Sequence, residues 1–440
     1  TSFEALTIAS FTSLLHPSFE IPAIDSFSEL LKYIYSMLDV FWWALVFVFV
    51  PTILMGASFP LIAQLALSRR DEEGRTVGTI YFFNIGGNVI GGALTGFVLL
   101  PILGTGVTLL FFCSVGLIFG LFVGHLGGRR VPLVPKLVVV TGLLATAVVL
   151  FPGAGQLYKA MHIRPAPWSQ QAEVFFEEGV EGVVLTYQTK DKDKVVNYIN
   201  GLVHGGRPGY KFYYETLEAL SFTPKLDHAL IIGFGTGSIT EMVSKAGDLQ
   251  KMTLVELNET LLDNLQKMRV FTTILDDSRL DVVIDDGRRY LLRTNDSFDL
   301  IAIDPLRTTT SYSNNLYSRQ FFELASQHLS DEGMFLIWTD EHKVMPNTVN
   351  AVFEYVRYYR YFILASNSPF SRHSARRAEV LAQFSPIDQQ RILAEGDDQY
   401  VGDQNYLSQK VGHYPINQDW DPVTEYYLGL KIKRKLYLDR

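Results

Sequence analysis

The chain has 440 residues, enough for two or three domains, and only 19% of them are charged. The formal net charge of −8 argues against a nucleic-acid partner, because surfaces that bind nucleic acid are usually basic. The single cysteine, Cys113, excludes an intrachain disulfide and a thiolate metal cluster, and we expect no metal site.

Long stretches without Asp, Glu, Lys or Arg fill the N-terminal third of the sequence. They are residues 40–67, 76–128 and 137–158. A helix needs roughly 20 apolar residues to cross a bilayer, so these stretches predict about four transmembrane helices within residues 40–152. The middle stretch holds two of them, at about 80–100 and 107–124. Residues 1–39 precede them as a segment that suits a helix at the membrane interface.

Basic residues in the connecting loops predict the orientation in the membrane. Arg69, Arg70 and Arg75 precede the second predicted span, and Arg129, Arg130 and Lys136 precede the fourth. By the positive-inside rule both loops are cytoplasmic, which places residues after 151 outside the cytoplasm. The fourth stretch, 137–151, is short for a crossing. If it does not cross, the rest of the chain is cytoplasmic.

The remainder of the chain has the pattern of an α/β protein. Residues 153–170 are rich in Pro and Gly and indicate a linker. Residues 171–205 contain β-branched and aromatic runs around Asp191-Lys192-Asp193-Lys194, which predicts a small antiparallel β module with a hairpin. Residues 206–365 alternate strands and helices, which predicts a Rossmann-like domain with a parallel sheet. Residues 366–440 form a C-terminal extension.

Glycine or acidic residues follow four of the five predicted strands. Because open α/β sheets bind ligands at the carboxyl ends of their strands, we expect these residues to share one site. They are Gly233, Gly235 and Gly237 after strand 228–232, Glu256 after 252–255, Asp286 and Gly287 after 281–284, and Asp304 after 298–303. The fifth predicted strand is 334–338.

These strand-end residues suit a nucleoside. Glycines let the backbone approach a ligand and begin a helix. Glu256, 19 residues after Gly237, can accept hydrogen bonds from both ribose hydroxyls, and Asp286 can accept one from an adenine amino group. The loop lacks the lysine of a phosphate-binding loop, which argues against a nucleoside triphosphatase. The alternative is an inherited fold that binds no nucleoside.

Several motifs resemble the spermidine synthase (polyamine aminopropyltransferase) family between residues 173 and 339. They are Tyr198-Ile199-Asn200-Gly201, Tyr213-Tyr214-Glu215, Gly233 to Gly237, Val255-Glu256, Asp286-Gly287, Asp304 and Leu316-Tyr317-Ser318. Residues 74–104 resemble the spans of bacterial proteins that fuse such a domain to a membrane region, which implies an integral protein of the bacterial inner membrane. Asn417, Asp419 and Glu425 resemble the acidic ending of these fusions.

The resemblance implies a role for each matching residue. Glu256 holds the ribose and Asp286 the adenine end of S-adenosylmethionine or its decarboxylated form. Asp304 positions and deprotonates the attacking amine, and a carboxylate base helps because the nucleophile must be neutral. Tyr213 and Glu215 line the pocket of the acceptor.

The sequence also departs from the family. Thr236 stands where the family has an Asp that binds the transferred group, Gly209-Tyr210 replaces an acidic pair, and His204 replaces a Gln. Three hypotheses therefore stay open. The chain is an aminopropyl transferase acting on a small amine, an S-adenosylmethionine-dependent methyltransferase with an amine or lipid acceptor near the membrane, or a non-catalytic subunit of a membrane complex.

Overall fold

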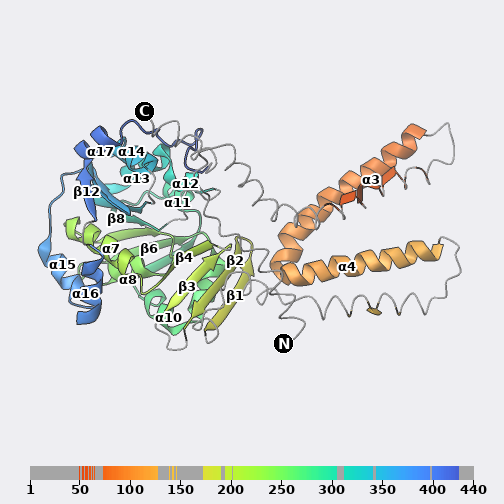
Figure 1. Ribbon diagram of the computed structural model, residues 1–440, viewed down its shortest axis with the longest axis horizontal. Helices are drawn as coiled ribbons and strands as arrows, with labels where there is room; N and C mark the ends of the chain where they lie inside the picture. Colours follow the sequence, from red (N-terminus) through yellow and green to blue (C-terminus); the bar gives the residue numbers. More distant parts are fainter. Residues whose placement is uncertain are drawn as a thin grey trace, which may run out of the picture. The chain divides into compact units, whose positions relative to one another are not determined.

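A computed structural model of the chain shows two compact units, one of residues 1–169 with 178–180, and one of residues 170–177 with 181–440 (Figure 1). We call them the helical unit and the α/β unit. The structure describes residues 73–126, 172–189, 194–200, 202–304, 312–339, 343–396 and 399–425, with scattered residues between 49 and 64 and between 138 and 145.

The helical unit contains two long helices joined by a break. Helix α3 (Glu73–Leu94) continues through a π-helical turn, η2 (Thr95–Leu99), into α4 (Leu100–Leu126). Gly104 interrupts α4 with φ 71° and ψ 170°, a backbone conformation that a residue with a Cβ rarely adopts. The two predicted helical segments at 80–100 and 107–124 are therefore confirmed, with their turn near Gly104. From this break α3 and α4 extend in the same general direction (Figure 1).

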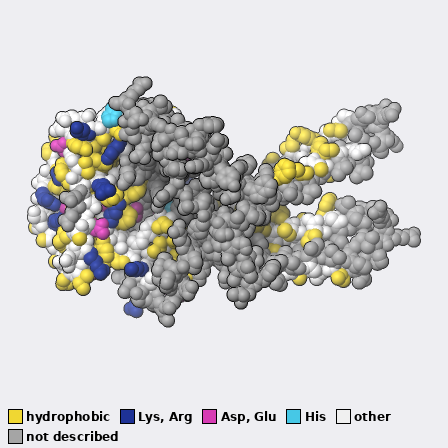
Figure 2. All heavy atoms as spheres, in the orientation of Figure 1, with side chains coloured by type: hydrophobic (Ala, Val, Ile, Leu, Met, Phe, Trp, Pro, Cys, Tyr) yellow, Lys and Arg dark blue, Asp and Glu magenta, His cyan; other side chains and the backbone are white. Residues whose placement is uncertain are grey.

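The apolar surface of this unit is exposed. Gly74–Gly120, with 47 residues, is one candidate membrane span by length and composition. Phe82, Phe83 and Phe97 are 71%, 71% and 83% exposed, whereas a core helix of a water-soluble protein buries such rings. Figure 2 shows hydrophobic side chains along both helices, α3 and α4. The first and fourth predicted spans and residues 1–39 lie almost wholly outside the described residues.

The α/β unit begins with a small antiparallel sheet, as the sequence predicts. Its strands, in the order β1-β2-β3-β4, are β1 (Glu173–Gly179), β2 (Gly182–Gln188), β3 (Val195–Ile199) and β4 (Leu202–Arg207). Strands β2 and β3 pair antiparallel from Val184↔Ile199 to Gln188↔Val195. The amide of Thr189 donates to the carbonyl of Lys194 at 2.9 Å, which confirms the predicted hairpin.

The larger sheet has the order β12-β10-β11-β9-β8-β5-β6-β7 among the described residues. Its strands are β5 (His228–Ile232), β6 (Lys251–Glu256), β7 (Leu280–Ile284), β8 (Phe298–Ile303), β9 (Leu329–Trp338), β10 (Tyr355–Tyr359), β11 (Phe362–Ser366) and β12 (Tyr400–Asp403). Strands β7, β6, β5, β8 and β9 are parallel. Strand β11 lies antiparallel between β9 and β10, so the sheet of this Rossmann-type fold is mixed rather than wholly parallel.

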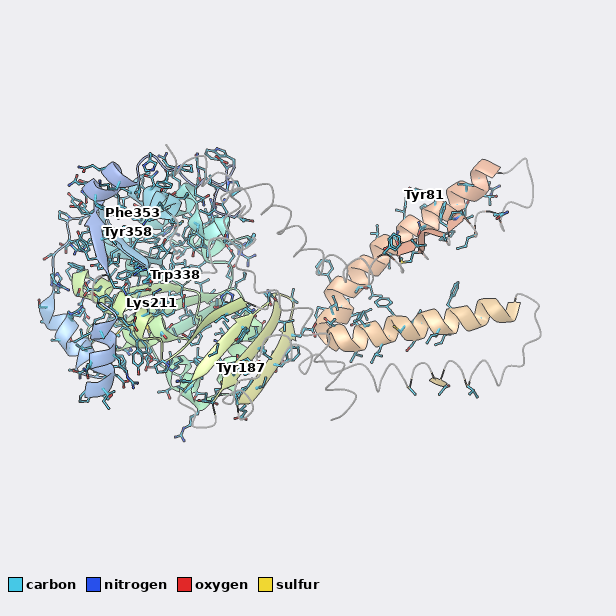
Figure 3. The ribbon with its side chains drawn as sticks, viewed as in Figure 1. Tyr81, Tyr187, Lys211, Trp338, Phe353 and Tyr358 are labelled. Atoms are coloured by element: carbon cyan, nitrogen blue, oxygen red, sulfur yellow. The ribbon has the colours of Figure 1, made fainter. Side chains whose placement is uncertain are left out.

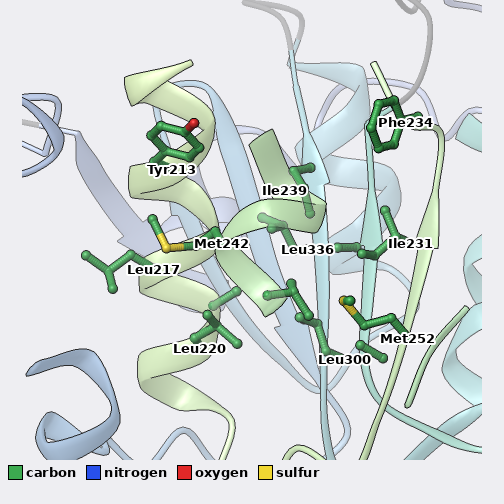
Figure 4. Close-up of a cluster of buried hydrophobic side chains, with 14 of the residues drawn as sticks. Tyr213, Leu217, Leu220, Ile231, Phe234, Ile239, Met242, Met252, Leu300 and Leu336 are labelled. Carbon is green, nitrogen blue, oxygen red and sulfur yellow. The ribbon is translucent and has the colours of Figure 1, made fainter. Parts of the chain in front are cut away.

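Helices cover both faces of this sheet. They are α7 (Tyr210–Phe222), α8 (Ser238–Ser244), α9 (Glu259–Gln266), α10 (Arg269–Leu275), α11 (Gly287–Arg293), α12 (Asn314–Tyr317), α13 (Arg319–Gln327), α14 (Val344–Asn350), α15 (Ser374–Leu381), α16 (Pro386–Ala394) and α17 (Gln404–Lys410). One buried cluster joins Leu217 and Leu220 of α7 and Met242 of α8 to Leu300 and Leu336 of the sheet (Figure 4). A second cluster fills the opposite face, beneath α11, α13, α14 and α17.

The C-terminal extension is part of the same unit. Strand β12 pairs antiparallel with β10, and Val380, Ile392 and Leu407 belong to the two buried clusters. Helices α15 and α16 pack on the outer side of α7, which explains why all residues of α7 from Tyr213 to Phe222 are buried.

Candidate functional site

A cleft opens at the carboxyl ends of the parallel strands. The chain passes from β5 outward to β6 and β7, then returns to β8 on the other side of β5, and such a reversal of strand order is where α/β sheets bind ligands. The cleft holds roughly 720 Å³ of non-atom space, a figure that includes open solvent at its mouth. Its lining includes Gly233, Gly235, Glu256, Asp286, Gly287 and Asp304, as the sequence predicts.

The glycine loop is shaped by its neighbour on β8. Gly233, Gly235 and Gly237 all have positive φ, at 88°, 55° and 71°. A Cβ on Gly235 would lie 2.3 Å from Oδ2 of Asp304, so only glycine lets the carboxyl group approach the loop so closely. The side-chain amide of Asn197, on β3, donates to the carbonyl of Gly235 at 2.9 Å. The small sheet therefore helps to hold the loop. Gly237 is the N-cap residue of α8 and is not among the residues that line the cleft.

Glu256 ends β6 with its carboxylate fixed by the backbone. The amides of Phe234 and Asn258 donate to its two oxygens at 2.7 and 2.8 Å. Burial raises the pKa of Glu256, and these backbone hydrogen bonds oppose the rise. Each carboxylate oxygen has a further lone pair, so the group can still accept a hydrogen bond from a hydroxyl in the cleft.

Asp286 has a structural role and also lines the cleft. It caps α11 by accepting a hydrogen bond from the amide of Arg289 at 2.8 Å. Its second oxygen accepts from the side-chain amide of Asn315 at 2.7 Å. Next to it, a Cβ on Gly287 would lie 2.3 Å from Cγ2 of Ile232. The tight packing of α11 on β5 places Asp286 at the rim of the cleft.

Asp304 follows β8, and its amide donates to the carbonyl of Ile232 at 3.0 Å. Part of the residue is exposed to the cleft, but its carboxyl group lies deep among protein atoms. Burial, together with the charge of Glu256, raises the pKa of Asp304 to about 7. A carboxylate with this pKa suits a general base near neutral pH.

Tyr213 and Glu215 lie on α7 and are not among the residues that line the cleft. The hydroxyl of Tyr213 donates to Glu241, whose carboxylate pairs with Arg207 at 2.8 Å. Glu215 is 1% exposed, and its Oε1 has no hydrogen-bond partner among the described residues. Burial raises the pKa of Glu215 well above its usual range, and the charge of Asp304 adds to the rise. Glu215 is therefore close enough to Asp304 to interact with it electrically. The role of both residues towards an acceptor stays a prediction.

The positions that depart from the family motifs divide into two groups. Thr236 is buried and its hydroxyl lies 3.1 Å from that of Ser238, so it serves the turn before α8. Tyr210 donates to Asp388 at 2.7 Å, outside the cleft. His204, on β4, does line the cleft, which gives it a place beside a bound ligand that the sequence alone did not favour.

The residues of one wall of the cleft were not predicted from the sequence to belong to the site. Tyr312, Ser313, Asn315, Leu316 and Tyr317 line it, although Leu316-Tyr317-Ser318 was recognised as a motif. We call residues 312–318 the wall segment. The chain's acidic ending holds it in place: Glu425 accepts from the amides of Tyr312 and Asn314 at 2.8 and 3.2 Å. Asn417 donates to the carbonyl of Tyr317 at 3.0 Å.

Comparison with known proteins shows what the α/β unit is similar to. The family model of the spermine/spermidine synthase domain matches residues 211–364. The polyamine aminopropyltransferase of Thermococcus onnurineus is 26% identical over 215 residues, covering 47% of this chain and 75% of that protein. The enzyme of Bacillus subtilis is 25% identical over 158 residues, covering 35% and 57%. This chain thus spans little more than half the length of the Bacillus relative.

A longer relative matches more of the chain. The polyamine aminopropyltransferase 2 of Streptomyces coelicolor is 28% identical over 298 residues, covering 65% of this chain and 53% of that protein. This match covers a larger share of the chain than residues 173–440 make up, so it includes residues before the first strand of the α/β unit.

Solved structures of spermidine synthases also match part of the chain. A complex with the transition state analogue AdoDATO has 19% identity and a TM-score of 0.41, covering 60% of this chain and 88% of its own. The Thermotoga maritima enzyme has 18% identity and a TM-score of 0.40, covering 60% and 87%.

Proposed function

Residues 211–364 belong to the spermine/spermidine synthase domain family, and from this premise we propose that the α/β unit is an aminopropyl transferase. Its donor is decarboxylated S-adenosylmethionine and its acceptor is a small amine. The adenosine part lies over β5, β6 and β7, with Glu256 on the ribose and Asp286 towards the adenine. The transferred group lies over β8, beside Asp304.

One observation carries this proposal more than the others. Asp304 combines position and chemistry: it borders the glycine loop, shares the cleft with Glu256, and has a pKa of about 7. A base of this strength can take a proton from an alkylammonium acceptor as it reacts. A site used only for structure would gain nothing from a buried carboxyl group with an unfavourable ionisation.

The reaction is a displacement at carbon. The neutral amine nitrogen forms a bond to the carbon next to the sulfonium, the carbon–sulfur bond breaks, and its electron pair leaves with methylthioadenosine. The proton lost by the amine goes to Asp304. Charge becomes more dispersed in the transition state, so a partly enclosed cleft with fixed dipoles favours the reaction over water.

Replacing Asp304 tests the proposal. Asp304→Asn keeps the shape but removes the base, and a general base typically contributes roughly 10²–10⁴-fold to the rate. We expect a loss of that size in the release of methylthioadenosine from decarboxylated S-adenosylmethionine with amine acceptors. Asp281→Asn, on the exposed side of β7, is the matched control and should keep the wild-type rate. Equal rates in Asp304→Asn and the control would show that the base lies elsewhere.

We further propose that the helical unit anchors the chain in a membrane, because its exposed apolar rings and its length suit lipid. The basic residues of the loops favour an α/β unit that lies outside the cytoplasm. Because S-adenosylmethionine is a cytoplasmic metabolite, that placement favours the second candidate function, a non-catalytic subunit of a membrane complex. A reporter that is active only in the cytoplasm, fused after Arg440, separates the two. The transferase hypothesis predicts reporter activity in the membrane fraction. A reporter that is present in that fraction but inactive would support the hypothesis of a non-catalytic subunit.

A further inference from the structure

A lysine ammonium lies among aromatic rings at the start of α7. Nζ of Lys211 is 3.4 Å from the ring centroid of Tyr361 and 5.7 Å from that of Trp338. Figure 3 labels Lys211 and Trp338 in the α/β unit. Rings at these distances attract a cation through their negative faces. Tyr361 and Trp338 come from different parts of the sheet, just before β11 and at the end of β9, so the fold assembles a seat for a positive charge. We call Trp338 and Tyr361 the cation seat.

None of Lys211, Trp338 and Tyr361 is among the residues that line the cleft, but the sheet places the cation seat at the strand end next to the proposed reacting centre. The parallel register pairs Ile303 of β8 with Ile337 of β9, so the next residues, Asp304 and Trp338, end neighbouring strands. Strand β9 is on the opposite side of β8 from β5, β6 and β7. If the nucleoside occupies those three strands, an acceptor that reaches Asp304 approaches from the side of β9.

Carboxylates complete the surroundings of Lys211. Glu215 follows it by one turn of α7 and is buried, and its charge acts on both Lys211 and Asp304. Burial lowers the pKa of Lys211, whereas Glu215 and Glu395 favour its charged form and Arg360 opposes it. Aromatic rings with carboxylates are the groups that bind an alkylammonium ion. In this chain the side chain of Lys211 occupies such a site.

We propose that Lys211 determines acceptor specificity: its ammonium occupies the cation seat, so the acceptor is an amine whose far end carries no positive charge. This inference rests on the proposed transferase function. A diamine would bring a second ammonium towards Lys211, and two like charges in a partly desolvated place repel strongly. An acceptor with an anionic far end would instead be attracted.

Three acceptors with four carbon atoms each test the inference: 1,4-diaminobutane, n-butylamine and 4-aminobutyrate. They differ only in a positive, neutral or negative far end. We would measure their binding to the full chain in detergent, with saturating methylthioadenosine, by calorimetry. The variant Lys211→Met keeps the length of the side chain and removes the lysine's charge from the seat, where Arg360 also lies over the ring of Tyr361 at 5.2 Å. Lys245→Met is the matched control, because Lys245 lies over the ring of Phe384 at 4.8 Å, away from β9.

The wild type should bind 4-aminobutyrate and butylamine at least 10-fold more tightly than the diamine. Lys211→Met should gain at least 10-fold for the diamine and lose affinity for 4-aminobutyrate, and Lys245→Met should behave as the wild type. No gain for the diamine in Lys211→Met, or an equal gain in Lys245→Met, would overturn the inference. Failure to bind methylthioadenosine would count against the transferase function instead, and the acceptor comparison made without it would still decide the role of Lys211.

Discussion

At the scale of single residues, the environment of Asp304 determines both its chemistry and its energetic cost. The fold presses its carboxyl group against the glycine loop and near the charge of Glu256. Ionising a carboxyl group in such a place is unfavourable, because burial and a like charge both disfavour the charged form. The native state therefore keeps this proton to about pH 7, whereas an unfolded chain releases it near pH 4.

This difference predicts how stability depends on pH. Between about pH 4 and 7 the native state holds one more proton than the unfolded state, so stability falls as pH rises through that window. Asp304→Asn cannot ionise and lacks this loss. At pH 8 we expect Asp304→Asn to have a higher thermal midpoint than the wild type, and a free energy of unfolding that is larger by on the order of a few kcal/mol. Both differences should disappear at pH 4. A gap independent of pH would show that Asp304 is not the titrating group.

Site residues could be predicted from the sequence only where a local pattern marks them. Glu256 and Asp304 directly follow apolar strand segments, and the order of such strands places their ends together. Asn197 and Asn315 could not be found in this way. Asn197 bonds to Gly235 and Asn315 to Asp286 across long separations in sequence, and neither position carries a periodic signal.

At the scale of elements, the acidic ending of the chain acts as a brace for the wall segment. Glu425 bonds to two backbone amides of that segment, and Asn417 bonds to Asn314 and to the carbonyl of Tyr317. Neither Glu425 nor Asn417 lines the cleft. The brace explains how residues distant from the ligand can influence binding, because the wall segment includes Asn315, the partner of Asp286.

Neutralising Glu425 tests the brace. Hydrogen bonds to a charged group contribute about 1.5–3 kcal/mol, so Glu425→Gln should weaken methylthioadenosine binding by roughly 10-fold through loss of order in the wall segment. Calorimetry measures the affinity, and hydrogen exchange at residues 312–318 measures the order. Glu379→Gln, on α15, serves as a control. Weaker binding without faster exchange would contradict the brace.

The parallel strands were predictable as elements, but the far end of the sheet was not. Strand 228–232 and strand 298–303 match their predicted bounds because both are short apolar runs with clear polar ends. Strand β10 pairs antiparallel with both β11 and β12, and β12 is distant from β10 in the sequence. Such pairing depends on contacts between distant segments, which local patterns do not specify.

At the scale of the whole molecule, the chain combines an apolar helical unit with a spermidine-synthase-like α/β unit. The cleft of the α/β unit forms within that unit alone, from residues of both sheets and the wall segment. Its chemistry can therefore be tested on the full chain in detergent without knowledge of partners or of the membrane side.

The most direct test is to compare two donors that differ by one carboxylate. Calorimetry on the full chain would measure the affinities for decarboxylated S-adenosylmethionine and for S-adenosylmethionine. At pH 8, above the pKa of Asp304, the account predicts tighter binding of the decarboxylated form, because the intact form brings a negative charge towards the ionised Asp304. It also predicts that Glu256→Ala weakens binding by on the order of 2 kcal/mol. Preference for S-adenosylmethionine would contradict the account and favour a methyltransferase, and binding of neither nucleoside would favour the non-catalytic subunit.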